Sequence, residues 1–323
     1  MGAKLKSLAS IFIPLLLGLG LTVYSYNSFT DEQMQQMKSY FVQADYNYVL
    51  LSLLLAVSGY VLRAYRWKYT LAEIDVQPDF KLNFLAVSIG YFVNLSIPRS
   101  GEVSRALILK KYQNVPFDKA FGTIIAERIV DLVILVLFIL AAFLVEYDTL
   151  KTFVLSYIPF EKLMMLIAVG LIGMIACIYL YFFSNLKVIL MLKEKVSGLK
   201  EGAMSVVNMP HKWEFLIYTL LIWISYVLMF YSATFALTAT GLVTIGTTLV
   251  TFVIGSLIIT FTNGGFGFFP VLIAKILLLY GIPLEAGNAF GWLVWISQLL
   301  VTVFLGVFGF LVLPLIRKKQ IIS

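Results

Sequence analysis

Cysteine and histidine are almost absent from this chain. Its 323 residues include a single cysteine, Cys177, and a single histidine, His211. One cysteine in an apolar run excludes a disulfide framework, and one histidine argues against a His/Cys metal site. The same shortage argues against a Ser–His–Asp or Cys–His nucleophile, so we expect no catalytic triad and no cofactor.

Charged residues are also scarce. They make up 13% of the chain, whereas hydrophobic residues make up 61%; soluble domains have roughly 25% and 45–50%. Long apolar runs, rather than short alternating ones, predict an all-α, polytopic helical membrane protein. The net charge of +7 comes from Lys and Arg between these runs, where they set topology and meet anionic lipid. It therefore does not indicate nucleic acid as a partner.

The apolar runs predict about six full spans in one integral membrane domain, residues 1–323. The expected spans cover residues 8–26, 46–66, 119–146, 163–184, 213–240 and 287–313. The first run follows Lys4 and Lys6 but lacks a cleavage site, so we interpret it as an uncleaved span. Basic residues at both ends of the chain predict cytoplasmic termini.

Two further basic stretches are expected on the cytoplasmic side. Arg63, Arg66 and Trp67 end the second span in a pattern typical of a membrane interface. Residues 186–210 mix apolar and basic residues at helical spacing, which fits an interfacial helix on anionic lipid. An ordinary basic connecting loop explains this segment equally well.

Two apolar segments are interrupted, and each contains an arm that is too short to span the membrane. In residues 82–111, about sixteen residues precede Pro98, after which Ser100 is a plausible N-cap for a second helix. In residues 243–281, a glycine-rich turn leaves about fourteen apolar residues in the second arm, against the ~20 that a span needs. We interpret both as re-entrant hairpins that enter from opposite faces. Such broken helices indicate a transporter's midplane site.

Ionisable residues gather around the first hairpin tip and in the span that follows. Each costs roughly 2.5–3.5 kcal/mol at the bilayer centre, so they pair with one another or face a charged ligand. We leave both explanations open: a structural network of zero formal charge, or a network that also binds substrate. The candidate residues are Asn94, Arg99, Glu102, Arg105, Glu127, Arg128 and Asp131.

The second tip supplies a different candidate. Its glycine-rich turn can present backbone amides to an anion, or it can simply allow another backbone to approach closely. The residues concerned are Asn263, Gly264, Gly265 and Gly267.

Four motifs in this order resemble the lysylphosphatidylglycerol synthase transmembrane-region family, also called flippase-like domain proteins. They are Arg63-x-x-Arg66-Trp67, Asn94-x-x-x-Pro98-Arg99-x-Gly101-Glu102-x-x-Arg105, Glu127-Arg128-x-x-Asp131 and Gly264-Gly265-x-Gly267. The resemblance implies movement of a lipid or lipid-linked headgroup across a bacterial or archaeal plasma membrane.

Two departures limit what the resemblance implies. In the synthases, a soluble aminoacyl-transferase domain follows the membrane region, whereas this chain stops at Ser323. We therefore do not expect lysyl transfer. Many members carry an acidic residue where this chain has Pro270, which argues against a cationic headgroup.

The sequence thus favours a lipid flippase or translocator for an anionic or lipid-linked headgroup. The expected partners are a membrane phospholipid or polyprenyl-linked lipid, a cell-envelope enzyme, or further copies of the chain. No G-x-x-x-x-G-K-[ST] motif is present, so energy would come from a gradient or from mass action. The alternatives are a membrane-embedded lipid enzyme that uses Glu102, Glu127 or Asp131 as acid or base, and an accessory subunit of a cell-envelope glycosyltransferase.

Overall fold

The fold was obtained as a computed structural model, which describes residues 16–77, 79–97, 100–157, 160–184, 208–262 and 264–316, with residues 186, 193 and 206. Every regular element in these ranges is a helix, which confirms the predicted all-α class. Residues 16–26 of the predicted first span are helical. Residues 8–15 of that span, most of the 186–210 segment and the basic C-terminal tail lie outside the described residues. So do three residues of the predicted tips: Pro98, Arg99 and Asn263.

Along the described parts of the chain, most consecutive helices are joined by short connections. After a helical segment over residues 16–28 the helices are α2 (Asp31–Val42), α3 (Tyr46–Ala72), α4 (Phe80–Ser96), α5 (Ser100–Gln113), α6 (Phe117–Val145), α7 (Tyr147–Tyr157), α8 (Phe160–Phe183), α10 (Lys212–Thr234), α11 (Ile245–Phe261), α12 (Phe268–Leu278) and α13 (Leu284–Val312), with a 3-10 turn η1 (Leu313–Leu315).

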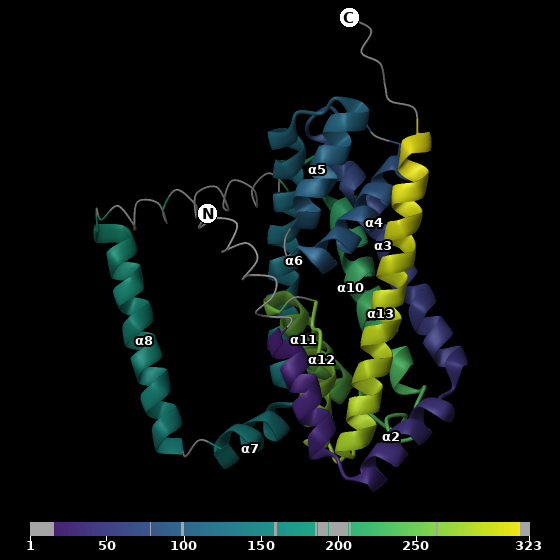
Figure 1. Cartoon of the computed structure of the whole chain (residues 1–323). Coiled ribbons are helices and arrows are strands. Elements are labelled where there is room, and N and C mark those ends of the chain that lie inside the picture. The colour runs from purple at the N-terminus through teal and green to yellow at the C-terminus, as the bar shows by residue number, and fades with distance from the viewer. Residues whose placement is uncertain are drawn as a thin grey trace, which may run out of the picture.

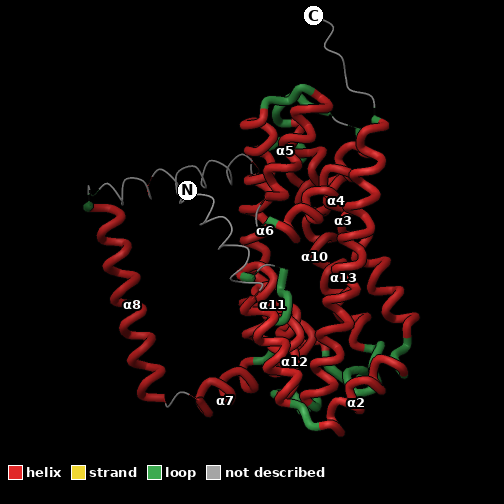
Figure 2. The backbone as a smooth tube through the Cα atoms, in the orientation of Figure 1, coloured by secondary structure: helices red, strands yellow, loops and turns green. Residues whose placement is uncertain are grey.

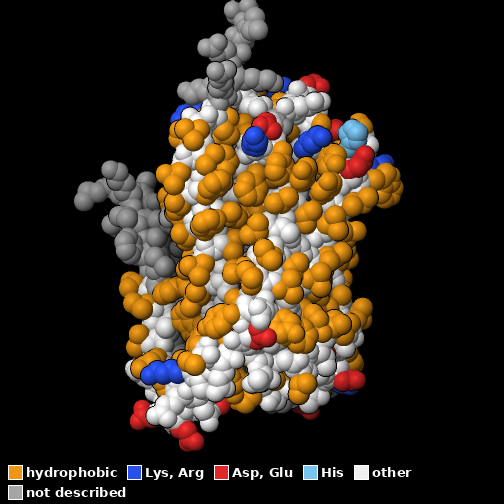
Figure 3. Space-filling model, turned by 90° about the vertical axis from the view of Figure 1, so that its right-hand side faces the viewer, with side chains coloured by type: hydrophobic (Ala, Val, Ile, Leu, Met, Phe, Trp, Pro, Cys, Tyr) orange, Lys and Arg blue, Asp and Glu red, His pale blue; other side chains and the backbone are white. Residues whose placement is uncertain are grey.

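Four of these helices, α3, α6, α10 and α13, are long and apolar enough to cross a membrane. The 24-residue α8 coincides closely with a fifth predicted span. Apolar side chains cover the band between the two ends of the molecule, and charged side chains lie mainly toward those ends (Figure 3). The chain is therefore a polytopic helical membrane protein.

Two short helices were not predicted. The segment expected to be an external loop contains α2, which begins with a capping box between Thr30 and Gln33. The other is α7, which follows α6 directly. Both are too short to span a bilayer, and their polar content hid them from a search for apolar runs. The predicted span over residues 213–240 is also shorter than expected, because α10 ends at Thr234.

Both predicted interruptions are real breaks between paired short helices. The first falls at Ile97, whose backbone is extended, between α4 and α5. The second is the turn between α11 and α12, where Gly264, Gly265 and Gly267 have φ values of +68°, +78° and +71°. The pair α4/α5 lies in the upper half of the molecule and the pair α11/α12 in the lower half (Figures 1 and 2).

The long helix α13 holds the two pairs together. Its N-terminal half packs on α12, where Gly291 leaves room for the backbone of Pro270. Its C-terminal half packs on α4, where Gly306 leaves room for Phe92. A side chain at either glycine would meet its neighbour below ordinary contact distance, so these glycines set the close helix spacing. The two breaks also lie close to each other, since a Cβ atom on Gly264 would lie 3.8 Å from Leu95 Cδ2.

Candidate functional site

A cluster of ion-paired side chains lies inside the bundle, where α3, α5 and α6 meet. We call it the charge cluster. Its members are Arg63 and Arg66 on α3, Glu102 and Arg105 on α5, and Glu127, Arg128 and Asp131 on α6.

Asp131 is the most heavily paired carboxylate in the cluster. Arg66 donates to both of its oxygens, at 2.6 Å and 3.1 Å. Arg63 Nη1 donates to Oδ2 at 3.0 Å, and Arg128 Nη1 lies 3.5 Å from the same oxygen. Three guanidinium groups thus converge on one carboxylate, which leaves it no room to act as a free acid or base.

Glu127 lies one turn earlier on the same face of α6 and is equally enclosed. Arg105 Nη2 donates to its Oε2 at 3.1 Å, and Arg66 Nε lies 3.7 Å from its Oε1. The exposed fractions of the Arg105 and Glu127 side chains are 4% and 1%. This pair joins the first hairpin to α6 through the protein interior.

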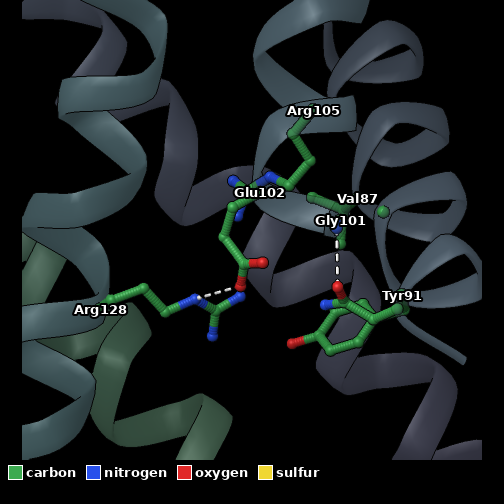
Figure 4. A pocket seen from close by; sticks show the side chains of 8 residues that line it. Val87, Tyr91, Gly101, Glu102, Arg105 and Arg128 are labelled. Carbon is green, nitrogen blue, oxygen red and sulfur yellow. Dashed lines mark hydrogen bonds and ion pairs between the residues drawn. The ribbon is translucent and has the colours of Figure 1, made fainter. Parts of the chain in front are cut away.

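The pair between Glu102 and Arg128 forms the least buried edge of the cluster. Arg128 Nε lies 3.2 Å from Glu102 Oε1, and the side chains are 33% and 19% exposed, in the order Arg128 and Glu102. Figure 4 shows the two side chains reaching toward each other from α6 and α5. Because partly exposed ion pairs contribute only about 0–1 kcal/mol, this pair can open at lower cost than the others.

Aromatic rings complete the walls around the guanidinium groups. Arg105 Cζ lies 4.0 Å from the centre of the Trp67 ring, and Trp67 Nε1 donates to Thr123 Oγ1 at 3.0 Å. Arg63 Nε donates to the hydroxyl of Tyr226 at 2.6 Å. Cation–π contacts of this kind hold desolvated guanidinium groups in fixed positions.

A small hollow opens between α4, α5 and Arg128 beside the cluster (Figure 4). Val87, Gly90, Tyr91, Asn94, Gly101, Glu102, Arg105 and Arg128 line it. Its volume of about 10 Å³ is roughly enough for one water molecule. Asn94 Oδ1 accepts a hydrogen bond from the Gly101 amide at 2.7 Å and so closes the break between the two helices.

Three polar atoms of the hollow's lining make no hydrogen bond within the described residues, and one of them, Arg128 Nε, is ion-paired with Glu102. Within the described part of the chain, Arg105 Nε and Glu102 Oε2 are shielded from solvent and make no hydrogen bond. One is a donor and the other an acceptor. Buried polar groups without partners cost about 1–3 kcal/mol each, so both are available to a ligand.

The cluster carries a net positive charge. Its four arginines and three carboxylates, counted over the described residues, sum to +1. The sequence had suggested zero for a set that counted Arg99, which lies outside the described residues. That set left out Arg63 and Arg66, because these two and Trp67 were expected at a membrane interface. That prediction was wrong: all three are buried. Their i, i+3 and i+4 spacing places them on one face of α3. This spacing was the feature of the sequence that could have indicated a shared buried face.

The second tip does not join the charge cluster. The amides of Gly264 and Gly265 already donate within the turn, to the carbonyl oxygen of Thr262 at 2.9 Å and to its hydroxyl at 3.0 Å. Gly267 packs against the carbonyl of Gly18 so closely that a Cβ atom would overlap it. The glycines therefore serve a tight turn and a close backbone contact, which was one of the two readings of this motif.

The structure places most of the predicted site residues of the first tip in or beside the hollow. Asn94, Glu102, Arg105 and Arg128 line the hollow, and Glu127 and Asp131 lie behind it in the cluster. Arg99 and Asn263 lie outside the described residues. Over the same described ranges, no three His, Cys, Asp or Glu side chains group closely enough to hold a metal ion.

The fold and this cluster define a class: a polytopic helical membrane protein with buried arginine–carboxylate pairs beside a break between helices. A model of the lysylphosphatidylglycerol synthase TM region matches residues 11–319. The chain belongs to that family, as its motifs had indicated.

Two relatives are archaeal proteins described only as UPF0104 membrane proteins. The one from Methanocaldococcus jannaschii is 33% identical over 118 residues, which cover 34% of this chain and 35% of the relative. The one from Pyrococcus horikoshii is 32% identical over 107 residues, 32% of each chain. The match thus spans about a third of each relative's length. No solved structure matches the chain significantly.

Proposed function

We propose that this protein is a lipid translocator that binds the phosphate of an anionic headgroup at the charge cluster. The observation that carries the proposal is the net charge of +1 on a buried cluster. An uncompensated guanidinium at membrane depth is costly. A phosphodiester, with one negative charge, neutralises it.

The unpartnered atoms of the hollow fit the same ligand. Arg105 Nε supplies a donor for a phosphate oxygen, and Arg128 becomes a second one when Glu102 leaves it. Guanidinium groups bind phosphate through two parallel hydrogen bonds. Glu102 Oε2 supplies an acceptor for a hydroxyl group on the headgroup, such as that of a glycerol or a sugar.

The hollow is closed to a headgroup in this structure, since its volume is about one water molecule. We place the entrance at the Glu102–Arg128 pair, because it is the most exposed and weakest pair of the cluster. An anion that competes for Arg128 opens the site as it binds.

The arrangement of the short helices supports movement rather than simple binding. One hairpin lies in each half of the molecule, and both pack on α13. Secondary transporters place substrate sites between such broken helices. We propose that both hairpins are re-entrant, that both termini face the cytoplasm, and that the membrane is the plasma membrane.

Ion pairing argues against the enzyme alternative. Glu127 and Asp131 are held by guanidinium groups, so neither is free for acid–base work. The third candidate carboxylate, Glu102, is ion-paired with Arg128. We therefore propose no enzyme activity, and specifically no lysyl transfer. An accessory role in a cell-envelope complex would instead show as a stably co-purified partner and no lipid movement by the isolated protein.

Fluorescent phosphatidylglycerol in proteoliposomes tests the proposal. We expect the parent protein to move this lipid between leaflets. Arg105→Lys keeps the positive charge but loses the two parallel hydrogen bonds of a guanidinium group, so it should be at least about tenfold slower. Lys110→Arg, at an exposed position on the same helix, is the control and should match the parent. Lipid movement by the Arg105 variant at the parent rate would refute this site.

A further inference from the structure

A row of polar side chains on α13 lies between the tips of the two hairpins. Trp295, Gln298 and Thr302 are spaced by three and four residues, so they share one face of the helix. All three side chains are half-buried, although they lie in a membrane-spanning helix. We call this face the polar row.

The polar row contacts the second tip at one end. Trp295 Nε1 donates a hydrogen bond to the carbonyl oxygen of Gly264 at 2.8 Å. The Trp295 ring also packs on Phe266, with ring centres 5.6 Å apart. This end of the row is therefore part of the wall of the glycine-rich turn.

The other end reaches the hollow at the first tip. Thr302 Oγ1 hydrogen-bonds to the hydroxyl of Tyr60 at 2.8 Å. The Tyr60 ring packs on Tyr91 with centres 5.0 Å apart, and Tyr91 lines the hollow. Contacts between described residues thus connect the charge cluster with the second tip.

Gln298 occupies the middle of this connection. It is the central residue of α13, about 21 Å from either end at 1.5 Å per residue. Its Nε2 atom is shielded from solvent and has no hydrogen-bond partner among the described residues. An amide donor left unpaired at this depth is unfavourable, which makes it a group that a passing ligand can satisfy.

We propose that the polar row is the path of the headgroup across the membrane centre, with Gln298 as the donor that holds it midway. This inference rests on the proposed function and adds its route. The ligand is a phosphodiester, either of a glycerophospholipid or of a polyprenyl phosphosugar. Neutral donors suit the middle of such a path, because a second cationic site would bind the anion too tightly to release it.

The amide of Gln298 is tested with two variants. Gln298→Leu removes the donor and puts an apolar side chain of similar size in its place. Gln298→Glu places a carboxylate on the path. We expect Gln298→Leu to slow movement of fluorescent phosphatidylglycerol about tenfold, the effect of one lost hydrogen bond at the barrier. Gln298→Glu should be slower still. Leu300→Ala, on the exposed side of α13, is the control and should match the parent.

Binding at the charge cluster is measured separately, as the rise in melting temperature on adding phosphatidylglycerol micelles. That rise should persist in both Gln298 variants and shrink in Arg105→Lys. A parallel assay with a polyprenyl phosphohexose shows which phosphodiester the path accepts. Movement of either lipid that slows in the Gln298 variants supports the proposed path. If the parent moves neither lipid, the proposed function itself fails. If the parent is active and both Gln298 variants match it, only the path is refuted.

Discussion

Arg66 on α3 and Asp131 on α6 form a two-pronged ion pair inside the bundle, with N–O distances of 2.6 Å and 3.1 Å. The Arg66 side chain is completely buried. A pair of this kind is strongly destabilising to break, because the remaining charge stays buried without a partner. It fixes α3 against α6 and so holds the wall on which the first hairpin rests.

Asp131→Asn should therefore destabilise the protein. The substitution keeps the shape of the side chain but leaves three arginines facing a neutral group, at a cost of about 3–5 kcal/mol. We expect a clearly lower melting temperature in detergent, measured by intrinsic fluorescence. Asp148→Asn, at an exposed position in the first turn of α7, should leave it unchanged; equal shifts for both variants would contradict the role of the cluster.

Glu102→Gln should leave the stability of the protein nearly unchanged and strengthen its binding of anionic lipid. The Glu102–Arg128 pair is partly exposed and contributes at most about 1 kcal/mol, so the melting temperature should stay close to that of the parent. The cluster charge rises from +1 to +2 and Arg128 loses its competitor. We expect stronger retention of anionic lipid, read by native mass spectrometry of gently extracted protein, and unchanged retention for Glu161→Gln on α8. Weaker retention would show that Glu102 contacts the ligand mainly as an acceptor.

Gly267→Ala and Gly122→Ala should shift stability in opposite directions. Gly267 has φ +71° and its missing Cβ faces the carbonyl of Gly18, so alanine there costs about 1–3 kcal/mol in backbone strain, besides the clash. Gly122 lies within α6 with nothing near its Cβ position, where alanine adds about 0.5–1 kcal/mol of helix stability. Melting temperatures of the two variants check both signs. A neutral Gly267→Ala would mean that the turn can adopt another conformation.

The breaks between short helices could be predicted from local sequence. Pro98 restricts the residue before it, and three glycines within four residues favour positive φ. Helix ends such as Tyr46, Val145 and Phe183 fell close to the expected positions, because they follow the length of apolar runs. The helix α2 was missed because its stability comes from caps and packing rather than from an apolar run.

The membership of the charge cluster could not be predicted in full. Glu102, Arg105, Glu127, Arg128 and Asp131 stood out because they interrupt apolar sequence. Arg63 and Arg66 lie at the end of a predicted span, where basic residues ordinarily face the interface. Whether such a residue turns outward or inward depends on the helices around it, and here α6 supplies the carboxylates that make burial possible.

The sequence by itself determined the class of the protein, the apolar lengths of its helices and the two places where they break, since each depends on neighbours within a few residues. Tertiary structure alone decided that four arginines share three carboxylates, and that α13 brings the two tips together. The reason is physical: ion pairing and close helix contact join residues that are distant in the chain. A local sequence pattern therefore does not predict which of these residues come into contact.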